Sequence, residues 1–346
     1  MIDPILAPLS PQLMHAPDGF FSPWLSLLGW VVIVVLIAFA IRSTREQLGE
    51  RQIPLMGIIA AAIFAGQMLN FTIPGGTSGH LLGGALAAII LGPWAAVLVM
   101  TAVIATQALL FQDGGLLVMS LNIINMGIIT SFVGYFVYQA LNKLGQSKPV
   151  MLGSAFVAAW ASVVVTSAFA AVELALSGTS PLSVALPAMV GVHVLIGLGE
   201  GLLTAFALGF ILATRPDLIG GEEAPGKRSA GWVLVGLLLA LAITLLAPLA
   251  SPYSDGLERV AEALAEPGSV EIMPLGFNVP EHPQFFGQAQ DAPYNVLPDY
   301  TLPPLGETGL STILAGMIGV LVVFGLAYGV GRVSHSRSPG HDAPSS

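Results

Sequence analysis

The 346-residue sequence contains no cysteine and very little charge. The absence of cysteine excludes disulfide frameworks, thiolate metal sites and cysteine nucleophiles. Asp, Glu, Lys and Arg make up only 9% of the chain, against roughly a quarter in an ordinary soluble domain. The net charge of −9 argues against nucleic-acid binding. Because Asp113 is the only charged residue between Pro54 and Asn142, this stretch is predicted to lie in a membrane.

Apolar segments long enough to cross a bilayer recur along the chain. We predict an all-α polytopic membrane protein, with about seven transmembrane helices in a first unit and two more that flank an extracytoplasmic loop. The segment 79–91 is too short to cross alone, so a tilted or partly inserted helix is expected there. The predicted spans are 23–41, 54–70, 79–91, 93–112, 114–141, 150–176, 184–214, 231–250 and 308–331.

The basic residues predict the orientation of these spans, since Lys and Arg favour cytoplasmic loops. With the first span running from outside to inside, ten of the eleven basic residues lie in the cytoplasm. The exception, Arg259, lies in the segment 251–307, which carries nine acidic residues and is expected outside. No recognisable metal cage occurs in that segment, and a solvated loop is the simplest interpretation. The N-terminus is predicted outside and the C-terminus in the cytoplasm.

Polar side chains at membrane depth are costly and are therefore the first candidates for function. His15 precedes a Pro-Asp-Gly turn, His80 ends the string Gly-Thr-Ser-Gly-His, and both are predicted on the outer side. Imidazole suits Ni, Co, Cu and Zn, so these histidines suggest a borderline divalent metal. A histidine that only forms hydrogen bonds is the alternative. Glu173, His193 and Glu200 are expected to line a cavity or to pair with a neighbouring helix.

Several strings resemble the CbiM/NikM family, the substrate-capturing membrane subunits of energy-coupling-factor (ECF) transporters for cobalt and nickel. They are MHAPDGFFSPW (14–24), GTSGHLLGGALAAIILGPWAAVLVMT (76–101), QALLFQDGGLL (107–117) and NIINMG (122–127). Two later strings resemble the PDGLE domain, which is similar to the two-span N component: SDGLERVAE (254–262) and PDYTLPPLGETGLSTILAG (298–316). Ser254 stands where the name of the domain leads one to expect proline.

The resemblance also implies a division of the chain and a location. The location is a bacterial or archaeal plasma membrane. The expected parts are an N-terminal extension (1–13), a CbiM/NikM-like membrane domain (14–216), a cytoplasmic linker (217–229), a PDGLE domain (230–333) and a disordered cytoplasmic tail (334–346).

In the family, the metal lies in a nearly square set of nitrogens near the N-terminus. Matched onto this chain, the resemblance assigns the N-terminal amine to Met14, an amide and an imidazole to His15, and a second imidazole to His80. Since Met14 is not the first residue of this sequence, we expect a mature chain that begins there, through a misassigned start or removal of residues 1–13. Polar residues of the matched strings that are expected to orient the ligands, or else to serve turns and helix packing, are Asp18, Thr77, Ser78, Asn122 and Asn125.

The resemblance implies a metal-capture subunit for high-affinity uptake of Co²⁺ or Ni²⁺, for example for cobalamin biosynthesis or nickel enzymes. The sequence has no GxxxxGK[ST] motif, so we expect no nucleotide bound by this chain. ATP hydrolysis would belong to separate ATPase (A/O) subunits, joined through a transmembrane coupling (T/Q) subunit. The alternative is a self-sufficient channel or ion-coupled carrier that uses Glu173, His193 and Glu200. An intramembrane metalloenzyme is disfavoured because no HExxH-like pair is present.

Overall fold

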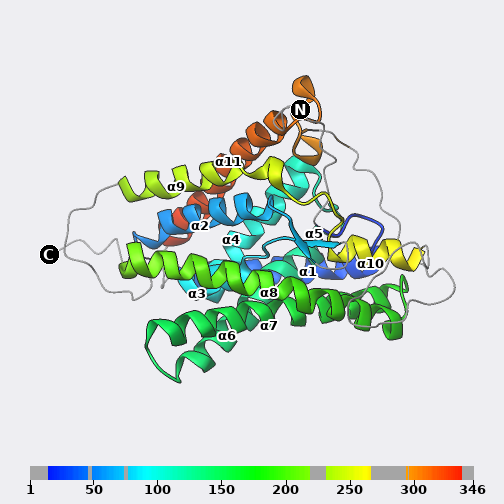
Figure 1. Ribbon diagram of the computed structural model, residues 1–346, viewed down its shortest axis with the longest axis horizontal. Coiled ribbons are helices and arrows are strands. Elements are labelled where there is room, and N and C mark those ends of the chain that lie inside the picture. Colours follow the sequence, from blue (N-terminus) through cyan, green and yellow to red (C-terminus); the bar gives the residue numbers. More distant parts are fainter. Residues whose placement is uncertain are drawn as a thin grey trace.

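The computed structural model describes residues 15–45, 49–73, 77–218, 231–265, 294 and 296–336. This part of the protein is mostly helical, and most helices run along the long axis of the molecule (Figure 1). Seven helical segments of the described chain are long and apolar enough to cross a membrane. They are α1 (Pro23–Thr44), α4 with the π-helical η1 (Pro93–Thr106, Gln107–Phe111), α5 with the π-helical η2 and α6 (Met119–Asn122, Ile123–Ile129, Thr130–Asn142), α7 (Lys148–Ser177), α8 (Leu182–Thr214), α9 with η4 (Gly231–Thr244, Ala247–Leu249) and α11 (Gly309–Ser336).

The prediction of a polytopic all-α protein is confirmed, whereas the count of nine spans is not. Helices occur in all nine predicted places, but α2 (Gln52–Gln67) has 16 residues and α3 (Gly84–Leu91) has eight. Both fall short of the roughly 20 residues that cross a bilayer. The prediction for 79–91 was wrong at its start, because residues 77–79 form a strand and the helix begins at Gly84.

Local sequence explains where the long helices begin and end. Pro23, Pro93 and Pro149 stand in the first turn of α1, α4 and α7, where the missing N–H costs no hydrogen bond. Gly178 ends α7 in a left-handed conformation (φ +74°). Helix α7 packs along α8, and α4 lies in the interior, with many residues that are buried completely. The part of the chain from Gly231 onward forms a second unit, and its helices α9 and α11 pack against α2.

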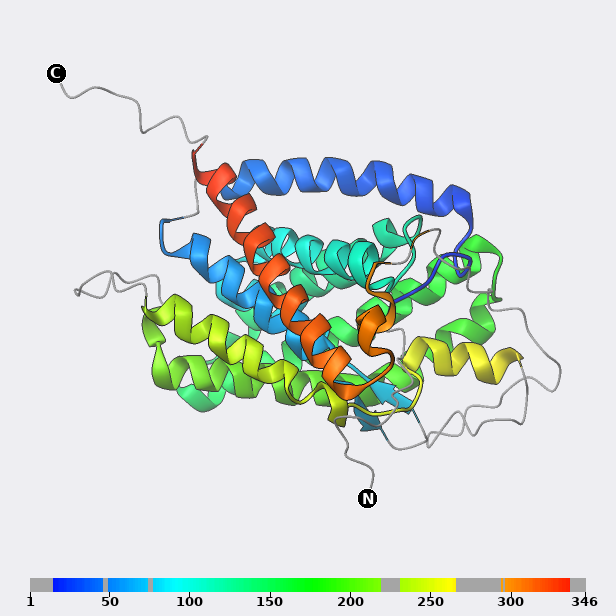
Figure 2. The ribbon, with the colours of Figure 1, turned by 90° about the horizontal axis from the view of Figure 1, so that it is seen from above.

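A short antiparallel hairpin interrupts the series of helices between α2 and α3. Strand β1 (Phe71–Ile73) pairs with β2 (Thr77–Gly79) in the register Phe71 to Gly79. The second unit docks on this hairpin: Ser78 forms a parallel bridge with Asp255, and its N–H donates to the carbonyl of Ser254 at 2.9 Å. Helix α10 (Gly256–Ala265) follows directly and lies against α8, as Figure 2 shows from above.

The docking of the second unit predicts a disulfide in an engineered variant. The side-chain oxygens of Thr72 and Ser251 lie 3.0 Å apart. Replacing both residues with cysteine in this cysteine-free chain should therefore give a disulfide on mild oxidation. After cleavage at a protease site introduced within residues 219–230, the fragments should stay joined on a non-reducing gel. The single-cysteine variants are the controls, and separated fragments in the double variant would contradict the docking.

Candidate metal site

His15 lies in the arm before α1, in close contact with a buried carboxylate. Its backbone N–H donates to Oδ1 of Asp113 at 3.1 Å, and its Nδ1 lies 2.9 Å from the same oxygen. Both side chains are fully buried. Burial lowers the pKa of the imidazole, but the carboxylate of Asp113 outweighs that effect, and the pKa of His15 is raised above its ordinary value. The backbone nitrogen and Nδ1 of His15 thus both face the same oxygen atom of Asp113.

The glycines of the string Asp-Gly-Gly allow the arm to approach this closely. Gly114 has φ +96°, and a Cβ there would lie 2.9 Å from the Cβ of His15. A Cβ at Gly115 would overlap the backbone and the carboxylate of Asp18. Any larger residue at either position would push the arm away, and the contact between Asp113 and His15 would be lost.

Two of the predicted orienting residues fix the same arm. Asp18 accepts the backbone N–H groups of Leu116 and Val118 at 3.0 and 2.9 Å, which joins the turn after His15 to the loop before α5. The amide nitrogen of Asn122 donates to the carbonyl of Ala16 at 3.0 Å. These contacts hold the peptides next to His15, so the two residues position the arm in the described structure.

His80 follows β2 and has one ring nitrogen engaged by the backbone. Its Nδ1 lies 3.0 Å from the carbonyl oxygen of Leu81, a contact that uses a proton on Nδ1, so that a neutral ring has its lone pair on Nε2. Histidines that bind metals usually donate their other N–H in this way. The carboxylate of Glu200 accepts the next two backbone N–H groups, of Leu82 at 2.7 Å and Gly83 at 2.9 Å. A buried charge in α8 therefore shapes the turn that carries His80.

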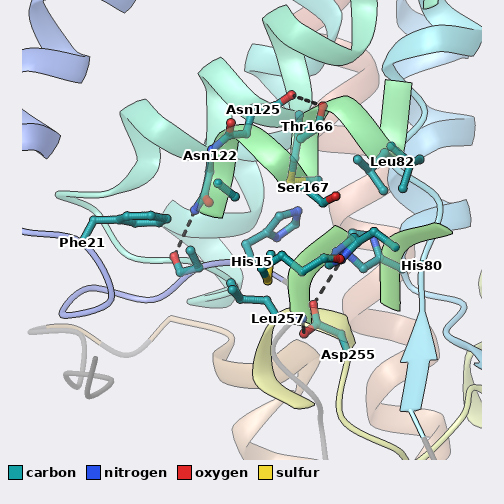
Figure 3. A pocket seen from close by; sticks show the side chains of 16 residues that line it. His15, Phe21, His80, Leu82, Asn122, Asn125, Thr166, Ser167, Asp255 and Leu257 are labelled. Atoms are coloured by element: carbon teal, nitrogen blue, oxygen red, sulfur yellow. Dashed lines mark hydrogen bonds and ion pairs between the residues drawn. The ribbon is translucent and has the colours of Figure 1, made fainter. Parts of the chain in front are cut away.

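The two histidines face one small cavity (Figure 3). Their ring centroids lie 5.6 Å apart, at an interplanar angle of 66°. The cavity has a volume of about 80 Å³ and is also lined by Asn122, His193 and Asp255. Organic ligands usually occupy 300 Å³ or more, so the size fits an ion better than a molecule.

Asp255, which belongs to the second unit, closes one side of the cavity (Figure 3). Its Oδ1 caps α10 by accepting the N–H groups of Leu257 and Glu258, at 3.0 and 2.9 Å. Its Oδ2 lies 4.0 Å from Nε2 of His80. Burial raises the pKa of Asp255 to about 7. Asp255 belongs to the string Ser-Asp-Gly-Leu-Glu in the segment 251–307, for which a solvated loop was expected, but the fold buries it.

Thr77 and Ser78 contact the second unit. The hydroxyl of Thr77 donates to the carbonyl of Ser254 at 3.1 Å, and that of Ser78 donates to the carbonyl of Tyr253 at 2.7 Å. Both residues thereby hold the strand that ends in His80 against the segment that carries Asp255. Their position links the two units at the edge of the cavity.

The remaining predicted polar residues have separate partners. Asn125 donates to the carboxylate of Glu173 at 2.6 Å, which joins η2 to α7. Nδ1 of His193 lies 2.7 Å from the carbonyl of Met189, one turn earlier in α8. Glu200 holds two backbone amides, so Glu173, His193 and Glu200 each have a different partner.

The side chains of the described residues do not complete a metal site. No group of three His, Asp or Glu side chains in the described part of the chain is arranged to hold a metal ion. Met14, the predicted amine ligand, lies outside the described residues, as does the N-terminal extension 1–13. Any site built here therefore needs backbone nitrogen or a further residue in addition to His15 and His80.

A bundle of membrane-crossing helices with two imidazoles at a small buried cavity defines a class: a polytopic membrane protein with a candidate site for a transition metal. Two family models match the chain, the cobalt uptake substrate-specific transmembrane region (CbiM) over residues 15–218 and the PDGLE domain over residues 230–336. The chain belongs to the CbiM family and carries a PDGLE domain behind the CbiM region.

Similar proteins support this assignment. The chain is similar to a NikMN protein of Archaeoglobus fulgidus, with 37% identity over 93% of this chain and 100% of the relative. It is 33% identical to the cobalt transport protein CbiM of Sorangium cellulosum, over 60% of this chain and 94% of the relative. A crystal structure of a truncated transition metal transporter matches 58% of this chain and 99% of its own, with 31% identity and a TM-score of 0.52.

The turn at His80 depends on Glu200, and this dependence can be measured. Glu200→Gln keeps one acceptor oxygen for two backbone N–H groups, so one buried donor loses its partner at a cost of about 1–3 kcal/mol. We expect a lower midpoint of thermal unfolding in detergent. The matched control is Glu173→Gln, whose single contact with Asn125 survives on the remaining oxygen. Equal midpoints for the two variants would show that Glu200 does not hold the turn.

Proposed function

We propose that this chain is the metal-capture subunit of an ECF transporter for high-affinity uptake of Co²⁺ or Ni²⁺. The observation that carries the proposal is the pair of buried histidines, His15 and His80, from two separate strings at one ion-sized cavity. The relatives are named nickel or cobalt transport proteins, in agreement with nitrogen as the chief donor.

The proposed ligands are the amine of Met14, the amide nitrogen and Nδ1 of His15, and Nε2 of His80. Adjacent amine and amide nitrogens close a five-membered chelate ring around a metal, and an amide with its own Nδ1 closes a six-membered ring. The arrangement of His15 supports this set, because its N–H and Nδ1 already share one partner atom. The proposal requires a mature chain that begins at Met14 and an amide that loses its proton, so binding should weaken as the pH falls.

The basic residues support an orientation of the chain in the membrane. Arg51 and Arg215 both contact Asp217, at the ends of α2 and α8 that lie away from the cavity. The excess of Lys and Arg in the predicted cytoplasmic loops supports a cytoplasmic location for these ends. The cavity would then open toward the outside of the plasma membrane, where the metal arrives.

The energy for transport would come from partner subunits. The sequence has no GxxxxGK[ST] motif, so separate ATPase (A/O) subunits and a coupling (T/Q) subunit are required. A carrier that works alone through Glu173, His193 and Glu200 is the competing function. The subunit is favoured because these three residues each engage a different partner, whereas a relay needs groups that exchange protons with one another.

Metal retention tests the proposed ligands. In His15→Ala or His80→Ala, loss of a nitrogen ligand should lower the affinity for Ni²⁺ and Co²⁺ by more than about 100-fold, since even outer-shell changes cost 10- to 100-fold. The measurement is the metal content of the purified full chain, followed by titration against a competing chelator. His335→Ala, in the last turn of α11, is the control. Unchanged retention in His80→Ala would remove that residue from the site.

Uptake in whole cells separates the subunit from the carrier. Cells that express this chain with its ATPase and coupling subunits should accumulate labelled nickel or cobalt. The same cells without the ATPase subunits should fall to the background of the empty vector. Full metal-specific uptake without those subunits would establish the carrier instead.

A further inference from the structure

Asp113 connects the candidate site to the second unit through its two oxygens. Its Oδ1 faces the N–H and Nδ1 of His15, at 3.1 and 2.9 Å. Its Oδ2 accepts the hydroxyl of Tyr300, at 2.7 Å. All three residues are buried, and Tyr300 belongs to the PDGLE domain. One carboxylate therefore spans from the proposed ligand to the second unit.

The carboxylate occupies the direction in which a metal would bind. A metal chelated by the amide nitrogen and Nδ1 of His15 must lie near both atoms at once. Oδ1 of Asp113 is now the atom that does so. Metal and carboxylate thus compete for the same two nitrogens, and loading requires Asp113 to give up these contacts.

Tyr300 is held firmly in place beside Asp113. Its ring stacks on Phe111 with centroids 4.6 Å apart and an interplanar angle of 13°. Its oxygen accepts Nε2 of Gln107 at 3.3 Å, and Gln107 also donates to Gln67 at 2.9 Å. Burial is the main cause that raises the pKa of Tyr300 well above its ordinary value, and the carboxylate of Asp113 adds to it. The hydroxyl therefore keeps its proton and can donate.

The backbone on both sides of this contact is strained. Gln112, Asp299 and Tyr300 are the only non-glycine residues with positive φ in the described part of the chain, at +60°, +49° and +57°. A side chain disfavours this left-handed conformation, which persists only where other contacts impose it. Gln112 directly precedes Asp113, Asp299 directly precedes Tyr300, and Tyr300 itself makes the contact. The fold therefore accepts strain on both units to bring these two side chains together.

We propose that Tyr300 is a positioning residue that keeps the Asp113 carboxylate against the two nitrogens of His15, where it competes with the metal. Through it, the second unit sets how readily the metal gains the chelating nitrogens. This inference rests on the proposed ligand role of His15. Because the contact of Tyr300 with Asp113 holds the carboxylate where the metal would bind, its removal should favour metal binding. By the same thermodynamic linkage, metal binding should weaken the hydrogen bond from Tyr300 to Asp113.

The test compares Tyr300→Phe with the matched control Tyr294→Phe in the full chain in detergent. Phenylalanine keeps the ring of Tyr300 on Phe111 and removes only the hydroxyl. The hydroxyl of Tyr294 donates to the carbonyl of Ala108 and not to Asp113. Hydrogen bonds to charged groups are worth about tenfold or more, so Tyr300→Phe should bind Ni²⁺ about tenfold more tightly, and Tyr294→Phe should match the wild type. Equal or weaker binding in Tyr300→Phe would overturn the inference.

A double variant and a metal-free measurement isolate the positioning role. In an Asp113→Asn background, Tyr300→Phe should add little to the change in affinity, because the charged acceptor is already gone. In the metal-free protein, hydrogen exchange of the His15 amide should be about tenfold faster in Tyr300→Phe than in Tyr294→Phe. If the wild type binds neither Ni²⁺ nor Co²⁺, the proposed function fails. Unchanged exchange at His15 would instead refute the role of Tyr300, whatever the metal result.

Discussion

The rest of the site depends on the contact between the carboxylate of Asp113 and two nitrogens of His15. A charge in a long apolar stretch is costly unless it is paired, and here the pairing brings an extended arm into the helical bundle. The glycines after Asp113 leave room for that arm, and Asp18 and Asn122 fasten it. The arm formed by residues 15–22 thus has one fixed position near the turn that carries His80.

The second unit completes this arrangement from outside the CbiM region. Asp255 caps α10 with one carboxylate oxygen and turns the other toward His80, while Tyr300 reaches Asp113. Thr77 and Ser78 hold the hairpin against the same unit. The cavity is therefore lined by both parts of one chain. Fusion of the two parts keeps these contacts intramolecular, so ordering the cavity carries no cost of bringing two molecules together.

The sequence predicted the helical membrane class, because hydropathy is a local signal, whereas the resemblance to a family placed His15 and His80 in one site. It did not reveal the hairpin, since three-residue strands are too short for an alternating pattern to show. The roles of Asp255 and Tyr300 were also missed, because hydropathy cannot distinguish the few loop residues that a fold buries from their solvated neighbours. Glu200 was recognised as a candidate, but its partners, two backbone amides of a distant turn, depend on tertiary structure.

The central claim is that the metal binds to nitrogen at the start of the mature chain, in the place that Asp113 now occupies. X-ray absorption at the nickel edge of the loaded full chain, with the N-terminal mass of the same sample, tests it most directly. The account predicts four nitrogen donors in a nearly square plane, two of them imidazoles, on a chain that begins at Met14. A six-coordinate, oxygen-rich centre, or full loading of a chain that retains residues 1–13, would contradict it.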